Sequence, residues 1–131
     1  MAIAIAGRCA ADEYLGVDVE RIEPRSPDFE EVAFTPQERS LLDSIGDAAR
    51  HEWVTRFWCA KEAVGKAIGR GLLHGPRSVL VRAVEAADGV VKVTIGDRFA
   101  GEFPELAGVF LTVYTTRHRD FIIASTLCER A

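Results

Sequence analysis

The chain has 131 residues, a length typical of one domain, and 48% of them are hydrophobic while 27% are charged. This composition excludes a disordered or low-complexity protein, and a chain of this length buries enough surface to fold without disulfides. The net charge of −4 argues against nucleic acid as a partner, and no apolar run reaches the roughly 18 residues of a membrane span. The sequence therefore predicts a single globular domain over residues 1–131, with neither nucleic acid nor membrane as a partner.

The number and spacing of the cysteines bear on the cellular compartment in which the protein is expected. Cys9, Cys59 and Cys128 are odd in number and lie far apart, which argues against a disulfide framework. With the three histidines they show no spacing typical of zinc ligands. The apolar start of the chain lacks a basic segment, so no signal peptide is predicted. A reducing, cytoplasmic setting is expected.

The first third of the chain predicts two strands, a loop and a short helix. Residues 2–6 predict a buried strand, and residues 14–20 alternate apolar with polar positions, which predicts a second strand. Residues 21–34 contain two prolines and predict a loop. Thr35 and Glu38 have the spacing of a capping box and predict the start of a helix that ends before residue 46.

The longest helical pattern covers residues 47–69, with Asp47 as the expected N-cap. One side of this helix is apolar at helical spacing and should face the core. Its members are Trp53, Phe57, Ala60, Val64, Ala67 and Ile68. The opposite side carries Trp58, Glu62 and Lys66 at intervals of four residues.

The last part of the chain predicts strands. Four segments are rich in β-branched and aromatic residues. They are residues 78–84, 89–95, 108–116 and 120–127. Because the helices are grouped between strands, the order predicts an α+β fold in which an antiparallel sheet packs against the long helix.

Three carboxylates and two lysines form the candidate site. Asp18 and Glu20 are two residues apart on one strand, so their side chains share a face. With Glu62 they would supply oxygen ligands for Mg²⁺, while Lys61 and Lys66 would hold the phosphates of a substrate. On spacing alone, solvated strand carboxylates and a surface ion pair between Glu62 and Lys66 remain the alternative.

Charge is segregated along the sequence. Residues 12–31 hold eight acids against two arginines, whereas residues 50–77 hold six bases against two acids. These segments are either two solvated faces or a metal-binding carboxylate cluster facing a surface for phosphates or an acidic partner. Gly65 and Gly69, on the polar side of the long helix, would let a ligand approach closely.

Two motifs together resemble one enzyme family. Residues 16–20 read Gly-Val-Asp-Val-Glu, and residues 56–67 read R-F-W-C-A-K-E-A-V-G-K-A. They resemble the two motifs of the 4′-phosphopantetheinyl transferase superfamily, a strand G-[VI]-D with an acid two residues on and a helix [FW]-x-x-K-E-[AS]-x-x-K. Gly-Arg-Gly-Leu at 69–72 resembles the G-x-G-L that follows this helix in the family. The resemblance covers nearly the whole chain.

The resemblance implies the family's fold and reaction. Family members transfer the 4′-phosphopantetheine arm of coenzyme A to a serine of an apo acyl or peptidyl carrier protein and release adenosine 3′,5′-bisphosphate. By position, Asp18, Glu20 and Glu62 resemble the ligands of Mg²⁺, and Glu62 also resembles the candidate base. The resemblance implies Glu62 and Lys66 as catalytic residues and Lys61, Lys66 and Gly69 as contacts of coenzyme A.

Carrier proteins are typically acidic, so the resemblance also suggests a docking face. Four arginines of the locally basic segment would form it. They are Arg50, Arg56, Arg70 and Arg77.

The family has two layouts, and the chain has features of both. Its length is similar to that of the holo-acyl-carrier-protein synthase type, a short chain that trimerises with its site at the interface. Its Asp-x-Glu pair resembles the second half of a surfactin-type enzyme, in which two pseudo-repeated halves form one chain. We therefore expect self-association, or a missing N-terminal half supplied by a larger protein. A catalytically inactive carrier-binding domain and another Mg²⁺-dependent phosphate enzyme are the competing hypotheses.

Overall fold

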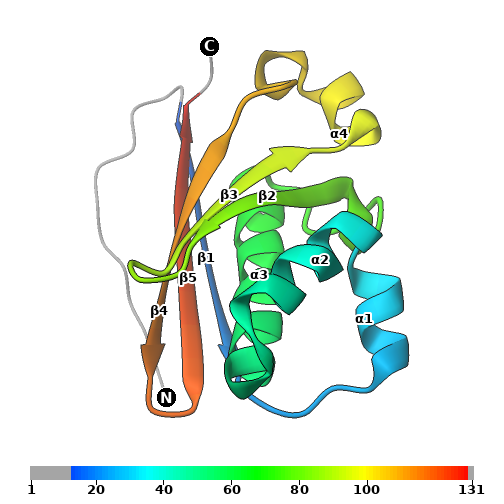
Figure 1. The fold of residues 1–131 in the computed structure, drawn as a ribbon. Coiled ribbons are helices and arrows are strands. Elements are labelled where there is room, and N and C mark those ends of the chain that lie inside the picture. The colour runs from blue at the N-terminus through cyan, green and yellow to red at the C-terminus, as the bar shows by residue number, and fades with distance from the viewer. Residues whose placement is uncertain (1–12, 130–131) are drawn as a thin grey trace.

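A five-stranded antiparallel sheet forms one layer of the computed structural model, which describes residues 13–129 (Figure 1). The strand order is β1-β5-β4-β3-β2. The strands are β1 (Glu13–Arg21), β2 (Val79–Glu85), β3 (Val90–Ile95), β4 (Leu111–His118) and β5 (Phe121–Glu129). All four strands predicted after the long helix are confirmed, as is the strand predicted at residues 14–20. The strand predicted at residues 2–6 lies outside the described residues.

The helices lie on one side of this sheet. The central helix α3 (Arg50–Ala67) runs along the sheet beside β1 and β5, with α1 (Pro27–Ala33) and α2 (Pro36–Ile45) next to it (Figure 1). A short helix, α4 (Asp97–Glu102), follows β3. Single 3₁₀ turns occur at η1 (Asp47–Ala49), η2 (Pro76–Ser78) and η3 (Pro104–Leu106). The structure thus confirms the predicted α+β fold.

The core lies between α3 and the sheet. The apolar stripe predicted on α3 is confirmed, because all six of its members are buried. Phe34 and Leu42 pack against this helix from the α1–α2 side, and Ile122 does so from β5. Within residues 13–129, no helix is both long and apolar enough to cross a membrane.

The capping box of α2 is confirmed. The Thr35 hydroxyl accepts from the backbone N–H of Glu38 at 3.2 Å, and the Glu38 carboxylate accepts from the N–H of Thr35 at 2.9 Å. The helix ends at Ile45, and Gly46 follows with a φ of 110°. This local signal was sufficient because both partners lie within one helical turn.

Two local expectations were wrong. Residues 21–34 are not all loop, because Ser26 caps α1 and Pro27 occupies its first turn, where proline needs no hydrogen-bond donor. Asp47 does not cap the long helix, because it opens the 3₁₀ turn η1 and Ala49 precedes α3. The helix α4 was not predicted from the sequence.

Candidate active site

β1 lies directly against α3 at Gly16. A Cβ atom at this position would be 1.9 Å from the backbone oxygen of Ala63, so only glycine permits this approach. Side chains alternate along a strand, and Asp18 and Glu20 therefore share the face of Gly16 that meets the helix. The close contact places both predicted carboxylates against the polar side of α3.

Asp18 is the centre of this arrangement. Its side chain is only 6% exposed, and its Oδ1 accepts a hydrogen bond from Lys66 Nζ at 2.6 Å. Its Oδ2 is buried without a hydrogen-bond partner among the residues that the structure describes. A buried carboxylate oxygen without a partner is costly, so this atom is available to a ligand.

Burial and the carboxylate of Asp18 raise the pKa values of the neighbouring Glu20 and Glu62 side chains. Burial, followed by the adjacent Asp18 carboxylate, raises the pKa of Glu20 to about 7, and the charge of Arg25 partly opposes this shift. Burial and the charge of Asp18 also raise the pKa of Glu62, against the effect of Lys66. The hydrogen bond to Asp18 raises the pKa of Lys66. The structure therefore brings Asp18, Glu20, Glu62 and Lys66 into one electrostatic unit.

The donor set of this unit suits a hard cation that is shared with a substrate. Within residues 13–129, no three His, Cys, Asp or Glu side chains lie close enough to enclose a metal ion by themselves. Magnesium usually keeps several waters and takes only one or two carboxylates together with substrate phosphates. The unpartnered Oδ2 of Asp18, beside two carboxylates of raised pKa, fits this second mode.

Lys61 does not belong to this unit, which corrects the expectation that it holds a phosphate. Its side chain is fully buried, and its Nζ donates to Glu38 Oε1 at 2.9 Å. The same nitrogen donates to the backbone oxygens of Pro76 at 2.8 Å and Val79 at 2.7 Å. All three donors of the ammonium are therefore used inside the protein. Lys61 joins α3 to α2 and to the start of β2.

The glycines predicted to admit a ligand have different positions. Gly69 lies just beyond α3 in the left-handed region, at a φ of 76°, where a glycine commonly ends a helix. It is exposed and has open space beside it, so a ligand can approach. The space beside Gly65 is filled by the chain itself, because a Cβ there would be 2.4 Å from the backbone oxygen of Gly71. Only Gly69 remains a candidate for ligand contact.

The four arginines predicted to form a basic docking face each have a partner inside the chain. Arg50 pairs with Glu30 and Asp43, and Arg56 pairs with Glu52. Arg70 pairs with Glu102, and Arg77 donates to the backbone oxygen of Glu31. Three of the four arginines are therefore ion-paired, whereas the contact of the exposed Arg77 is with a neutral backbone oxygen and leaves its charge uncompensated.

Sequence reasoning missed two residues that bear on the site. Glu38 was recognised as a cap, yet it is also the buried counter-ion of Lys61, and its Oε2 accepts from the backbone N–H of Val81 at 2.8 Å. Arg25 acts on Glu20 through its charge. The only sequence signal for Arg25 was its position as one of two bases in the acidic segment.

Sequence comparisons relate the chain to one family. Residues 14–124 match the family model described as the 4′-phosphopantetheinyl transferase superfamily. Over 61 residues the chain is 39% identical to the 4′-phosphopantetheinyl transferase HetI of Nostoc sp., a match that covers 44% of this chain and 25% of HetI. The matched part thus spans a quarter of the length of that relative.

Three solved structures share the fold. Holo-[acyl-carrier-protein] synthase from Neisseria meningitidis has a TM-score of 0.70 at 18% identity, covering 88% of this chain and 97% of that chain. The ACPS–CoA complex from Chronobacterium ammoniagenes has a TM-score of 0.69 at 22% identity, covering 91% and 98%. Acyl carrier protein synthase from Mycobacterium tuberculosis is 31% identical, with a TM-score of 0.58 and coverage of 90% and 97%.

Proposed function

Because the chain belongs to the 4′-phosphopantetheinyl transferase superfamily, we propose that it transfers the 4′-phosphopantetheine arm of coenzyme A to a serine of an apo acyl or peptidyl carrier protein. The observation that carries this proposal is the pairing of Asp18 with Lys66 beside the raised-pKa carboxylates of Glu20 and Glu62. Attack on a pyrophosphate needs a base and compensation of phosphate charge, and this unit offers both. The solved complex of a structural relative with CoA supports coenzyme A as the co-substrate.

In the proposed reaction the serine oxygen forms a bond to the phosphorus that carries the pantetheine arm. The bond from that phosphorus to the bridging pyrophosphate oxygen breaks, and adenosine 3′,5′-bisphosphate leaves. Glu62 accepts the serine proton, directly or through a water, and its raised pKa makes it a better base than an ordinary glutamate. Lys66, half exposed beside Asp18, compensates charge on the phosphates.

Asp18, together with Glu20 or Glu62 and the phosphates of the substrate, would hold Mg²⁺, and the bound ion would neutralise charge that develops on the pyrophosphate. Gly69, at the open end of α3, is the proposed point of close approach for coenzyme A. We propose the cytoplasm as the compartment.

We further propose that the domain works with a second half, either another copy of the chain or a linked domain. The sheet face away from α3 supports this, because apolar side chains are exposed on it. Leu15 is 39% exposed, Leu127 is 50% exposed and Tyr114 is 61% exposed. Strand pairing places Leu15 opposite Leu127, so these side chains are neighbours on that face.

The test is the intact mass of an apo carrier protein incubated with the chain, coenzyme A and Mg²⁺. We expect a gain of one phosphopantetheine arm that EDTA abolishes. Asp18→Ala and Glu62→Ala should each abolish the gain while the far-UV circular dichroism stays unchanged. Glu85→Gln, an exposed acid at the end of β2, is the matched control and should retain activity.

The competing hypotheses are separated by this experiment together with a carrier-binding assay and a nucleotide-hydrolysis assay. Carrier binding without any mass gain, across a panel of carriers, would identify a catalytically inactive carrier-binding domain. Hydrolysis of a nucleotide in the absence of a carrier would identify another Mg²⁺-dependent phosphate enzyme. Retained transfer in either alanine variant would contradict the proposed roles of these carboxylates.

A further inference from the structure

A glycine-rich segment follows the last residues of α3. Residues 69–75, called the glycine loop from here on, form turns and bends and contain neither helix nor strand. Gly69, Gly71 and Gly75 have positive φ angles of 76°, 58° and 90°. Glycine leaves the backbone more conformational freedom than any other residue, so such a segment is costly to hold in one shape. The loop begins at Gly69, the proposed point of approach for coenzyme A, so its shape bears on binding.

The first part of the glycine loop is fixed by the end of α3. The N–H of Gly69 donates to the carbonyl oxygen of Lys66 at 3.0 Å. The N–H groups of Arg70 and Gly71 both donate to the carbonyl oxygen of Gly65, at 3.1 and 2.9 Å. These backbone bonds are typical of the end of a helix, and they hold the loop as far as residue 71.

The glycine loop is also held from outside by α4. Glu102, the last residue of this helix, accepts a hydrogen bond from Arg70 Nε on its Oε2 at 3.2 Å. Its other oxygen, Oε1, accepts from Nε2 of His74. One carboxylate thus bridges two loop residues that are four positions apart. The hydrogen bond from His74, followed by the one from Arg70, lowers the pKa of Glu102, so the carboxylate is ionised at neutral pH.

Two aromatic side chains next to Glu102 orient its partners. The ring of His74 lies against that of Phe99, a fully buried residue of α4, with 4.8 Å between the ring centroids. The guanidinium of Arg70 lies over the ring of Phe103, 5.8 Å from its centroid. Leu73, between the two anchored residues, is 68% exposed. The outer part of the loop is therefore attached to α4 on both sides of an exposed residue.

The exposure of these ion pairs shows that global stability does not explain them. The side chains of Arg70, Glu102 and His74 are 50%, 34% and 21% exposed. Ion pairs this close to solvent add little to the free energy of unfolding. They restrict a flexible segment instead, and a loop that already has its bound shape spares a ligand the cost of ordering it. None of the three residues belongs to the electrostatic unit around Asp18.

We propose that Glu102 is a positioning residue, which holds the glycine loop through Arg70 and His74 in the shape that coenzyme A meets at Gly69. Glu102 acts through the loop and does not contact the substrate. The identity of the ligand rests on the proposed function, whereas the attachment of the loop to α4 is a property of the fold. Loss of Glu102 should therefore weaken the binding of coenzyme A and leave the chemical step unchanged.

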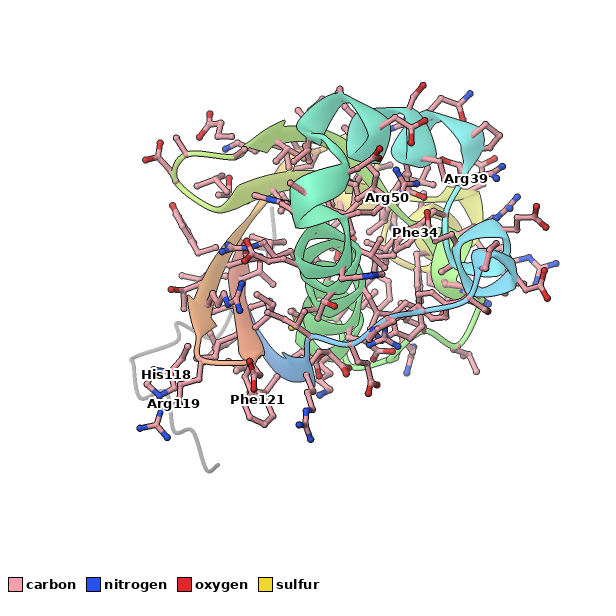
Figure 2. All side chains as sticks on the ribbon, turned by 60° about the horizontal axis from the view of Figure 1, so that its bottom comes forward. Phe34, Arg39, Arg50, His118, Arg119 and Phe121 are labelled. Atoms are coloured by element: carbon pink, nitrogen blue, oxygen red, sulfur yellow. The ribbon has the colours of Figure 1, made fainter. Side chains whose placement is uncertain are left out.

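Hydrogen–deuterium exchange measured by mass spectrometry tests the attachment without any substrate. Glu102→Ala should raise the exchange rate of a peptide covering residues 69–75 by about threefold or more, while α3 stays protected. Glu102→Gln keeps an acceptor oxygen for one partner, so its effect should be smaller. Glu105→Ala, the same change three residues further on, is the matched control. Arg119→Gln, in the turn between β4 and β5, should likewise leave the exchange of the loop unchanged (Figure 2).

Calorimetric titration with coenzyme A and the transfer assay test the consequence. Glu102→Ala should raise the Kd and the KM for coenzyme A about fivefold to tenfold and leave kcat within about twofold. Arg70→Gln should act in the same direction, because it removes one of the two attachments. A merely structural defect would lower the active fraction, and hence kcat, at an unchanged KM. The proposal is overturned if Glu102→Ala matches Glu105→Ala in loop exchange or in affinity for coenzyme A.

Failure of the proposed function would give a different pattern of results. The wild-type chain would then neither bind coenzyme A nor modify a carrier protein, whereas faster exchange in Glu102→Ala would still show that Glu102 holds the loop. If only the present inference fails, the wild-type chain transfers the arm, and Glu102→Ala equals it in loop exchange and in KM. The two failures are therefore distinguishable.

Discussion

The buried ion pair between Lys61 and Glu38 yields the sharpest prediction, because the family motif and the structure give Lys61 different roles. We predict that Lys61→Met mainly lowers stability. The substitution keeps the side chain long and apolar, and it removes an ammonium whose Nζ lies 2.9 Å from Glu38 Oε1. Three hydrogen bonds disappear together, since the same nitrogen serves the backbone oxygens of Pro76 and Val79.

The size of the loss in unfolding free energy follows from the environment in which Glu38 remains once its counter-ion is removed. Glu38 is 1% exposed and would keep two backbone donors, the N–H groups of Thr35 and Val81, but no counter-charge. Removal of one partner from a buried ion pair costs about 3–5 kcal/mol. Single domains are usually stable by about 5–15 kcal/mol, so the variant should lose a large part of its free energy of unfolding. The melting temperature should fall by roughly 10–20 °C.

Urea denaturation followed by tryptophan fluorescence measures the loss. The double variant Lys61→Met with Glu38→Gln removes the buried charge as well, so it should be more stable than Lys61→Met alone. Arg98→Gln, on the first turn of α4, is a control that removes a positive charge outside this network and should change stability little. A Lys61→Met protein of near wild-type stability that has lost affinity for coenzyme A would refute this reasoning and restore Lys61 as a phosphate ligand.

Three further predictions follow from the site and the core. Gly16→Ala places a methyl group 1.9 Å from the Ala63 backbone oxygen, so it should push β1 away from α3 and reduce transfer. The free energy of unfolding measured in urea should fall by about 1–3 kcal/mol. An unchanged free energy of unfolding would contradict the observed contact. The folded state holds a proton on Glu20 up to a pKa of about 7, whereas an ordinary glutamate loses it near 4.5, so the free energy of unfolding should fall as the pH rises between these values. Glu20→Gln should flatten that part of the profile of urea midpoints between pH 4.5 and 8, and an equally steep profile would show that other groups cause it. Trp53→Ala removes a side chain that is 4% exposed and should cost about 3–5 kcal/mol in thermal unfolding, and an unchanged melting temperature would contradict its place in the core.

Sequence patterns whose interacting residues lie within one or two helical turns predicted the helices well. The capping box at Thr35 and the apolar stripe of α3 depend on neighbours one or two turns away, and both are present. The helix α1 shows the limit of this reasoning, because Pro27 was interpreted as a loop residue although proline also suits the first turn of a helix. Ser26 before Pro27 was the available signal, as a residue type that commonly caps a helix.

Burial of polar residues was not predictable in the same way. The alternation in β1 identified which residues share a face, but it did not show that the face with Gly16 and Asp18 is the one against α3. An apolar face usually turns inward, yet Leu15 is 39% exposed while Asp18 is 6% exposed. The reversal follows from contacts between segments far apart in the sequence, since Gly16 meets Ala63 across the β1–α3 contact.

The adjacent motif residues Lys61 and Glu62 show how one short sequence serves both stability and chemistry. Successive residues on a helix point roughly 100° apart, so two neighbours cannot face the same partner. Lys61 turns toward α2 and β2, where its pairing with Glu38 fixes the position of α3. Glu62 lies on the side of α3 that faces β1, where burial and the charge of Asp18 raise its pKa. A helix held by Lys61 on one side therefore presents Glu62 and Lys66 to β1 in a fixed register, which is why loss of Lys61 should reduce transfer indirectly, through the fold.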